Sequence, residues 1–353
     1  MNSKAISALL LALVGTVVLG RPTNAEQINA CLITRTDTNP FYIKMKAGAE
    51  KEAAELGIVL KTYAGKVDGD NESQVAAIET CIADGARGIL IAPSDTKAIV
   101  PSVKKARDAG ILVIALGRPL DPIDAADQTF ATDSVEAGRL VGSWVAAVQD
   151  NKIQEGRSAV LNFGQFASYD VDLARDTGFQ TGLAINEAGT VSCDCDCRQT
   201  SCKDRCKSCK KVSDYAATGG TTEGGRKAAD DLLRMDPAIN VIFATNEPVA
   251  VGAYQALEAI GKQHDVVIVS TDGECAGISK VDEGVISATS LEFPDRMGAL
   301  GVAAIRKWSD SGEKPKQTEG KNFIDTGVSL VTNKPVNGVP SIDTKEAAAL
   351  CGN

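Results

Sequence analysis

The chain has 353 residues, of which 37 are Lys or Arg and 46 are Asp or Glu, so its formal charge is −9 at pH 7. An acidic surplus of this size does not favour nucleic acid as a partner, because electrostatic binding to phosphates requires clustered positive charge. The length is sufficient for two lobes with separate hydrophobic cores.

The first 25 residues have the organisation of an export signal. Lys4 supplies a positive start, residues 6–19 form an apolar run, and Thr23-Asn24-Ala25 precede an expected cut before Glu26. The apolar run is short for a membrane span, although an uncleaved anchor helix is the alternative. No cysteine follows the expected cut, so a lipid anchor is not indicated. The mature chain is then exported into a compartment where disulfides persist.

The first structural unit expected is a buried strand at 28–34 followed by a helix that begins at Asn39-Pro40-Phe41-Tyr42. From Phe41 onward the apolar residues recur at every third or fourth position. Asn39 suits an N-cap, and Pro40 suits the first helical position. The turn places an amide and two aromatic rings at the carboxyl edge of a sheet, where open α/β folds bind ligands. A helix cap followed by core aromatics is an equally good local interpretation.

Apolar, β-branched runs then alternate with amphipathic stretches along the chain. The expected strands occupy residues 58–63, 88–92, 112–116, 158–163, 241–244, 266–271 and 286–290. The expected helices occupy residues 73–84, 96–109, 134–149, 172–184, 222–233, 249–260 and 295–309. This alternation is typical of parallel sheets with helices on both faces, and the number of strands favours two sheets over one.

Motifs typical of common enzymes are missing. No Gly-x-Gly-x-x-Gly follows the first strand, and the chain contains no Walker A sequence and no Gly-x-Ser-x-Gly elbow. The single histidine, His264, lies in a polar turn and is interpreted as a solvated loop residue. The sequence therefore predicts no catalytic residue and no cofactor, and the chain is not expected to be an enzyme.

Five short motifs follow one another in an order that resembles a known family. They are residues 36–42, 88–95, 244–248, 270–273 and 293–294. With the export signal, they resemble the periplasmic sugar-binding proteins of ABC transporters, in the ribose- and fructose-binding branch, over nearly the whole mature chain. Each motif is weak by itself, and the order of all five is the specific feature.

This resemblance implies an α/β fold of the type I periplasmic binding protein, with two doubly wound parallel-sheet lobes joined by three hinge crossings. The crossings are expected at 132–133, 292–293 and 325–326. The N-terminal lobe is expected at 26–132 plus 293–325, and the C-terminal lobe at 133–292 plus 326–353, with a Cys-rich insertion at 192–211.

The resemblance also implies which residues of the first lobe contact a sugar. Asn39, Phe41 and Tyr42 match first-lobe contacts of the family, and Arg118 matches an arginine that usually follows an aspartate. Gly117 occupies that aspartate position, which leaves the first-lobe carboxylate open; Asp121 and Asp37 are the substitutes considered. Polar groups of this kind bind sugar hydroxyls, and aromatic rings cover the C–H faces.

From the second lobe, Asn246 and Asp272 match an amide and a carboxylate that bind sugar hydroxyls; the alternative is that they only cap helices. Glu292 stands where the ribose branch has glutamine, and an ionised carboxylate accepts hydrogen bonds without donating any. Arg175 matches a family arginine less securely, and a surface ion pair is the competing interpretation.

Four scattered cysteines are expected to form one disulfide in each lobe. Cys31 and Cys81 lie in the first lobe, on the first strand and the second helix, and are predicted to pair. Cys275 and Cys351 lie in the other lobe and form the second predicted pair. Both bonds enclose long loops, which favours stabilisation in the chain-entropy account.

Six further cysteines fall within residues 192–211, a segment whose composition differs abruptly from the rest. They are Cys193, Cys195, Cys197, Cys202, Cys206 and Cys209. A small disulfide knot, a thiolate metal site and a stretch that is not native coding sequence remain as interpretations. No resident metal is predicted, because the paired Cys-x-x-Cys spacing of zinc ribbons is not repeated.

The function that these features imply is capture of a monosaccharide, fructose- or ribose-like, in an interlobe cleft of a monomeric periplasmic protein that delivers it to an ABC permease. The alternative is a sugar-sensing protein of chemotaxis or signalling with the same fold. A repressor is disfavoured because the chain begins with an export signal and not with a DNA-binding helix pair.

Overall fold

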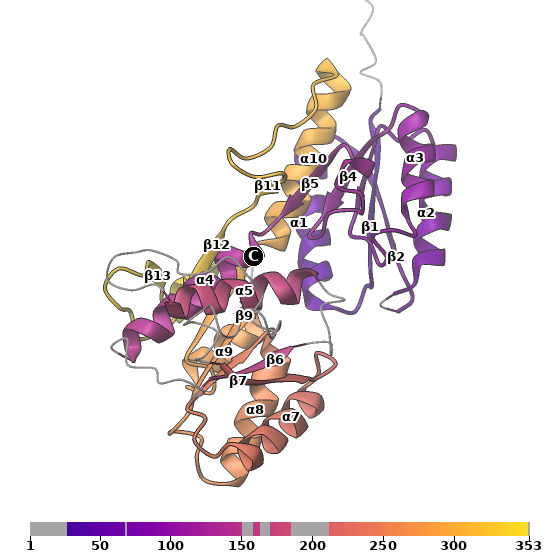
Figure 1. Cartoon of the computed structure of the whole chain (residues 1–353). Helices are drawn as coiled ribbons and strands as arrows, with labels where there is room; N and C mark the ends of the chain where they lie inside the picture. The colour runs from indigo at the N-terminus through magenta and orange to yellow at the C-terminus, as the bar shows by residue number, and fades with distance from the viewer. Residues whose placement is uncertain (1–26, 68, 150–157, 163–169, 185–211, 352–353) are drawn as a thin grey trace, which may run out of the picture.

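The computed structural model describes residues 27–67, 69–149, 158–162, 170–184 and 212–351. They form two lobes, each a sheet with helices on both faces, stacked along the long axis of the molecule (Figure 1). The expected signal peptide at 1–25 and the Cys-rich segment at 192–211 lie outside the described residues. Among the described residues, none of the helices combines the length and apolar character of a membrane crossing.

The N-terminal lobe contains a six-stranded sheet in the order β11-β5-β4-β3-β1-β2, in which every neighbouring pair is parallel. Its strands are β1 (Asn29–Thr34), β2 (Val59–Ala64), β3 (Gly88–Ile91), β4 (Leu112–Leu116), β5 (Gln128–Ala131) and β11 (Ile324–Asp325). Its helices are α1 (Pro40–Leu56), α2 (Asn71–Ala83), α3 (Val100–Asp108) and α10 (Pro294–Ser311), with a 3₁₀ turn at Ile123–Ala125.

The two faces of this sheet are covered by different helices because side chains alternate along each strand. Ala30 and Leu32 of β1 join the core beneath α1 and α10, whereas Cys31 and Ile33 join the core beneath α2 and α3. All four residues are almost inaccessible to solvent. A strand buried on both faces reads as a continuous apolar run, which explains why 28–34 was recognisable as a strand.

The C-terminal lobe contains a seven-stranded sheet in the order β13-β12-β10-β9-β8-β6-β7. Its strands are β6 (Ser158–Asn162), β7 (Val212–Ala217), β8 (Val241–Ala244), β9 (Val267–Asp272), β10 (Ala288–Glu292), β12 (Val328–Val331) and β13 (Ser341–Ile342). Its helices are α4 (Ser134–Val148), α5 (Asp170–Ala184), α7 (Thr222–Met235), α8 (Glu247–Ala259), α9 (Cys275–Asp282) and α11 (Thr344–Cys351). The expectation of parallel strands needs one correction, because β12 runs antiparallel to β10.

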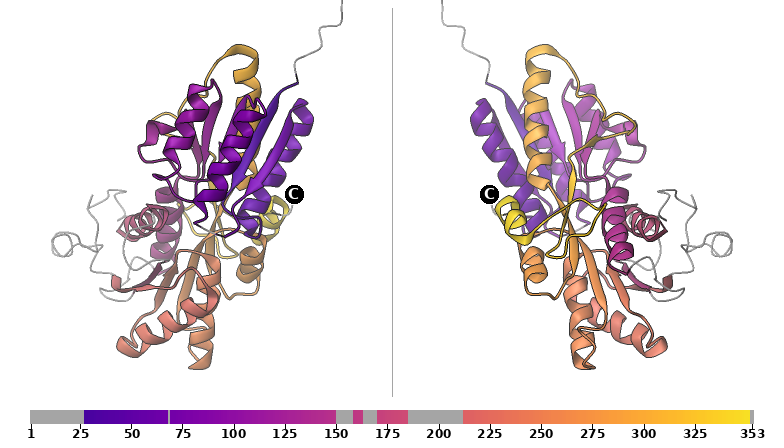
Figure 2. Two further views of the ribbon diagram at one scale, coloured as in Figure 1. Left: turned by 90° about the vertical axis from the view of Figure 1, so that its right-hand side faces the viewer. Right: turned by 90° about the vertical axis from the view of Figure 1, so that its left-hand side faces the viewer.

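The chain passes between the lobes after β5, after β10 and after β11, as Figure 2 shows from two sides. Charged side chains brace these passages: Lys321 Nζ lies 2.7 Å from Asp133 Oδ2, and Arg296 Nη1 donates to the Thr326 carbonyl at 2.9 Å. The Arg296 guanidinium also lies 4.2 Å from the ring centre of Phe293. We propose the expected crossings at 132–133, 292–293 and 325–326 as the hinge.

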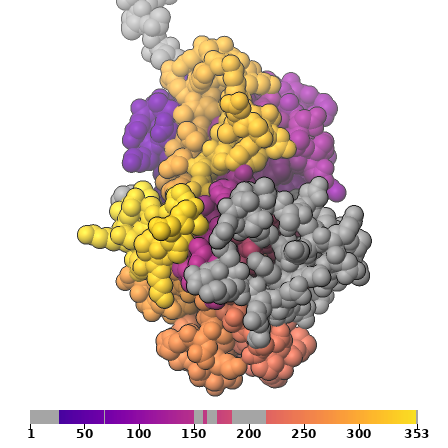
Figure 3. All heavy atoms as spheres, turned by 60° about the vertical axis from the view of Figure 1, so that its left-hand side comes forward, coloured from indigo at the N-terminus to yellow at the C-terminus, as the bar shows by residue number. Residues whose placement is uncertain are grey.

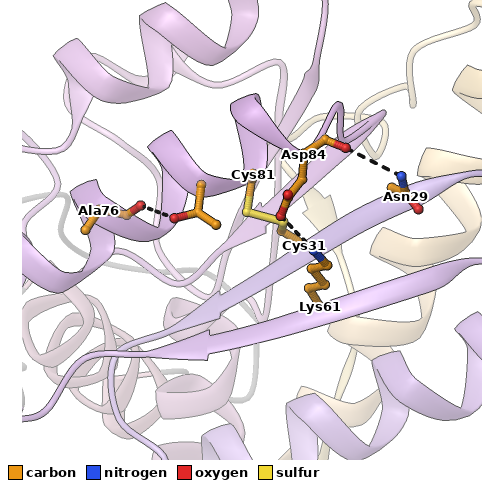
Figure 4. The surroundings of a disulfide bond; sticks show 7 residues. Asn29, Cys31, Lys61, Ala76, Cys81 and Asp84 are labelled. Atoms are coloured by element: carbon orange, nitrogen blue, oxygen red, sulfur yellow. Dashed lines mark hydrogen bonds and ion pairs between the residues drawn. A yellow bond between two sulfur atoms is a disulfide. The ribbon is translucent and has the colours of Figure 1, made fainter.

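Both disulfides expected from the sequence are present. Cys31 on β1 is bonded to Cys81 on α2, with 6.3 Å between their Cα atoms, beside an ion pair of Lys61 and Asp84 (Figure 4). The Cys275–Cys351 bond joins α9 to α11, with 5.3 Å between the Cα atoms. Each bond therefore lies within a single lobe and does not restrict movement between the lobes.

Helices α4 and α5 approach unusually closely because glycines face each other at their contact. A Cβ atom on Gly138 would lie 1.9 Å from the Arg175 carbonyl oxygen, and one on Gly178 would lie 2.0 Å from the Val135 carbonyl oxygen. Gly142 and Gly182 repeat the arrangement one turn further along. This contact sets the position of the α5 backbone at Arg175.

The α4–α5 contact makes a stability prediction. The variant Gly138→Ala inserts a methyl group against backbone and is expected to lower the free energy of unfolding by about 1–3 kcal/mol. Urea denaturation measures this change, and Val148→Ala, on an exposed part of the same helix, is the control with little expected effect. Equal stabilities of Gly138→Ala and the wild-type protein would contradict this account of the packing.

Candidate functional site

A cavity of about 230 Å³ lies between the two lobes. Drug-sized ligands usually occupy pockets of roughly 300–1,000 Å³, so this cavity suits a smaller molecule. All eight site residues expected from the sequence line it: Asn39, Phe41, Tyr42, Arg118, Arg175, Asn246, Asp272 and Glu292. The structure brings them together from both lobes; whether they bind a ligand is a proposal developed below.

The first wall is the turn between β1 and α1. The Asn39 side-chain oxygen accepts a hydrogen bond from the Phe41 backbone N–H at 2.9 Å, and Pro40 follows at the first helical position. The rings of Phe41 and Tyr42 meet edge to face, with 5.4 Å between their centres. Capping and lining the cavity are therefore compatible roles, because the Asn39 oxygen caps the helix while the amide nitrogen remains a donor.

Arg118 lines the same wall from the turn after β4, next to Gly117. Gly117 adopts a φ of +74°, and a Cβ atom there would meet only the edge of Phe41 at 3.9 Å. Neither Asp121 nor Asp37 lines the cavity, and Asp121 Oδ2 lies 3.2 Å from Lys97 Nζ instead. Neither aspartate therefore replaces the carboxylate that the resemblance implied at position 117.

The opposite wall is organised by the buried guanidinium of Arg175. Its Nη2 atom lies 2.7 Å from Asp272 Oδ1 and 2.5 Å from Glu292 Oε1. Its Nη1 atom donates to the Thr245 carbonyl at 2.7 Å. The Arg175 side chain is only 9% exposed, so the surface ion pair considered for it is wrong. Burial opposes its charge, but the two carboxylates hold the pKa of Arg175 above its usual range.

The surroundings of Asp272 disfavour the charged form of its carboxyl group. Burial raises its pKa from 3.8 to about 7, with Glu292 and Glu274 acting in the same direction and Arg175 against them. Its backbone has a φ of +104°, which no other non-glycine residue shares among those that the structure describes. Left-handed backbone of this kind is costly for a residue with a Cβ atom and is retained where the surroundings enforce it.

Hydrogen bonds to Glu247 hold the turn that follows Asp272. The Glu247 carboxylate accepts hydrogen bonds from the backbone N–H groups of Gly273, at 3.0 Å, and Glu274, at 3.2 Å, and from the Thr289 hydroxyl at 3.0 Å. Burial, with the charge of Asp272, raises the pKa of Glu247 well above its usual range. The residue therefore ties the start of α8 to the turn after β9 and to β10.

Asn246 occupies the edge of this wall at the start of α8. Its side-chain oxygen accepts from the Val249 N–H at 3.0 Å, so the helix-cap interpretation is correct as far as it goes. Its amide nitrogen donates to the Gly220 carbonyl at 3.2 Å. An amide nitrogen carries two hydrogens, so one donor is left for the cavity that the residue lines.

A family model described as a periplasmic binding protein domain matches residues 30–314. The chain belongs to this family. It is 29% identical over 309 residues to the ribose import binding protein of Escherichia coli, covering 87% of this chain and 93% of that protein. It is 28% identical to a D-ribose/D-allose-binding protein of Pseudomonas aeruginosa, covering 87% and 89% of the two chains.

Solved structures share the fold of this periplasmic binding protein. A solute binding protein from Actinobacillus succinogenes with bound D-allose has a TM-score of 0.71 at 21% identity and covers 92% of this chain and 100% of its own. One from Bacillus halodurans with bound myo-inositol has a TM-score of 0.70 at 22% identity, covering 92% and 98%. The type I fold inferred from the sequence is thereby confirmed.

Several cavity residues of this periplasmic binding protein escaped the sequence analysis. They are Arg35, Thr36, Thr132, Ser134, Asp172 and Glu274, with apolar neighbours. Arg35 directly follows β1 and Glu274 follows the Asp272-Gly273 turn, so their positions at strand ends were the available signal.

In the described ranges, no group of three or more His, Cys, Asp or Glu side chains has a metal-binding arrangement.

The raised pKa of Asp272 predicts a pH dependence of stability. Between pH 3.8 and about 7 the folded protein holds a proton that the unfolded chain releases, so this carboxyl contributes less stability as pH rises. Asp272→Asn does not titrate, and its free energy of unfolding relative to wild type is expected to rise by roughly 2 kcal/mol from pH 5 to 8.

Urea denaturation of both ligand-free proteins at the two pH values measures this difference. Titrating groups distant from Asp272 contribute equally to both proteins and cancel in the comparison, so the difference reports Asp272 and the carboxylates coupled to it. A difference between the two proteins that stays constant, or that falls as pH rises, would contradict the assigned environment of Asp272.

Proposed function

We propose that this periplasmic binding protein captures a monosaccharide, ribose- or fructose-like, in the interlobe cavity and delivers it to an ABC permease of the inner membrane. The observation that carries the proposal is the pair of carboxylates, partly exposed Asp272 and buried Glu292, which Arg175 holds opposite the Asn39 amide and two aromatic rings. The curated relatives named above, which bind ribose or allose, support the same class of ligand.

The chemistry of the cavity suits a ring-shaped polyol. Carboxylates accept hydrogen bonds from hydroxyl groups, and charge-assisted bonds of this kind are stronger than neutral ones. The rings of Phe41 and Tyr42 provide an apolar surface for C–H groups. Glu292 accepts from Arg175 and is nearly buried, so it acts on the ligand chiefly by fixing the Arg175–Asp272 pair.

Delivery depends on the two lobes. A ligand that touches both walls binds the closed form more tightly than the open form, and it shifts the equilibrium only by that difference in affinity. The closed, liganded form is then the form that a permease recognises. The family consists of solute-binding proteins and not enzymes, so the bound sugar leaves the protein chemically unchanged. We expect the protein to act as a monomer in the periplasm without nucleic acid.

A thermal-shift screen tests the proposal. The mature chain is heated with D-ribose, D-allose, D-fructose, myo-inositol and, for comparison, amino acids. One or a few sugars are expected to raise the melting temperature by several degrees, because ligand at 100 times its Kd stabilises the fold by about 2.7 kcal/mol. A response to amino acids and to no sugar would overturn the proposed function.

Two variants test whether the sugar that raises the melting temperature binds in the cavity. Asp272→Ala removes a carboxylate, and Asn246→Ser removes the amide while keeping an oxygen that can cap α8. Both are expected to lose the sugar-dependent shift, whereas Asp265→Ala, an exposed acidic residue in the loop before β9, is expected to keep it. Full retention of the shift in both cavity variants would show that the sugar binds elsewhere.

A further inference from the structure

The lobes touch outside the cavity, where α1 of one lobe meets α11 of the other. Lys44 Nζ donates a hydrogen bond to the Leu350 carbonyl oxygen at 2.8 Å. Leu350 is the penultimate residue of α11, where helix carbonyls lack partners within the helix and the helix dipole is negative. An ammonium group from one lobe thus caps the C-terminal end of a helix in the other lobe.

A carboxylate of the C-terminal lobe also acts on this face of α1. Glu274 of the C-terminal lobe lines the same cavity as Phe41 of α1. Its negative charge, together with that of Asp295, acts on Lys44. Phe41 and Lys44 are three residues apart on α1, so they lie on the same face of its first turn. One face of α1 therefore bonds to the C-terminal lobe at Leu350 and faces Glu274 of that lobe across the cavity.

These two points are joined covalently. Glu274 directly precedes Cys275 and Leu350 directly precedes Cys351, and the two cysteines form the disulfide between α9 and α11. The same helices share a small apolar core with Leu291 of β10. The segment that carries α11 is drawn in yellow and lies at the level where the lobes meet (Figure 2, Figure 3).

We propose that Lys44 and the disulfide-linked α9–α11 pair form a closure clasp that holds the lobes together around a bound ligand and sets the rate at which the ligand leaves. The hydrogen bond from Lys44 joins α1 of one lobe to α11 of the other, so it stabilises the state in which the lobes are together. The clasp rests on the proposed function, because its role presupposes closure around a sugar.

This assignment has a kinetic signature. Ligand enters the open protein, so loss of a contact made on closure does not slow association, which rises only in proportion to the open fraction of the ligand-free protein. Dissociation requires reopening, so the same loss makes dissociation faster. A residue that contacts the sugar directly, or one that merely stabilises a lobe, does not produce this pattern together with a change in the lobe equilibrium.

The first test replaces the ammonium group. Lys44→Met keeps the length of the side chain and is expected to speed dissociation of D-ribose or D-allose about fivefold, without slowing association, in stopped-flow measurements on the mature chain. This is the scale of one partly exposed hydrogen bond to a charged group. Lys46→Met, on the same helix and paired with Glu50, is the matched control. Equal dissociation rates for Lys44→Met and wild type would overturn the clasp.

The second test compares the dissociation rates of two variants, each of which lacks one of the two disulfides. Cys275→Ser with Cys351→Ser frees α11 from α9 and is expected to speed dissociation, whereas Cys31→Ser with Cys81→Ser removes a bond buried in the other lobe and is expected to lower stability without this kinetic effect. The same acceleration in both double variants would show a general loss of stability and would overturn the role of the α9–α11 bond.

Small-angle scattering without ligand separates failure of the clasp from failure of the proposed function. Lys44→Met is expected to have a larger radius of gyration than wild type and Lys46→Met, because the closed form is less populated. If none of the sugars binds but this increase is seen, the sugar function fails and the clasp stands. If the radius and the dissociation rate both stay at wild-type values, the clasp is overturned whatever the ligand.

Discussion

The guanidinium of Arg175 is the interaction on which the rest of the site depends. It joins α5 to the ends of β8, β9 and β10 through Thr245, Asp272 and Glu292. Removing three charges from water is costly, and the cost is offset only when the partners are close and well oriented. Without Arg175, the two carboxylates would face each other as like charges and at least one would be neutralised.

A close helix contact, between α4 and α5, lies directly behind this cluster. The α5 backbone at Arg175 reaches its position because Gly138 of α4 has no side chain. On the other side, Glu247 holds the turn that carries Asp272 in an unfavourable left-handed conformation. Close helix packing, left-handed backbone and neighbouring charges thus all act on the Asp272 carboxylate. Local strain of this kind lowers stability and is retained where it fixes a functional group in position.

Helix α1 of the N-terminal lobe contributes both to the cavity and to the contact between the lobes. The first turn of α1 supplies the Asn39 cap and the two aromatic rings to the cavity, and its outer side supplies Lys44 to the end of α11. One short segment therefore contacts the ligand space and the opposite lobe at once. That double use makes the position of α1 the natural point at which ligand binding and lobe closure are coupled.

The central strands were readable from the sequence for a simple physical reason. Residues 112–116 and 241–244 are buried on both faces, so their apolar runs have sharp ends that coincide with β4 and β8. Short or polar strands such as β11 (Ile324–Asp325) and β7 (Val212–Ala217) carry no such signal and were missed. Helix α11 was missed because its eight residues become a stable helix only by packing on α9.

The candidate site was predictable where topology alone brings residues together. Asn39 follows β1 of one sheet, whereas Asn246 and Asp272 lie at the carboxyl ends of β8 and β9 of the other, and the family motifs mark all three. The burial of Arg175 and the hydrogen bond of Lys44 to α11 were not predictable, because both depend on distances between segments far apart in the chain. Local sequence records which groups are near a strand end and not which partners face them.

A crystal structure of the mature protein saturated with the sugar that stabilises it most is the most direct measurement of the central claim. The account predicts one monosaccharide in the interlobe cavity, with a hydroxyl group within hydrogen-bonding distance of Asp272 and a second hydroxyl at the Asn246 amide, between closed lobes. Sugar bound at another surface, with the Arg175–Asp272–Glu292 cluster facing only solvent, would contradict it.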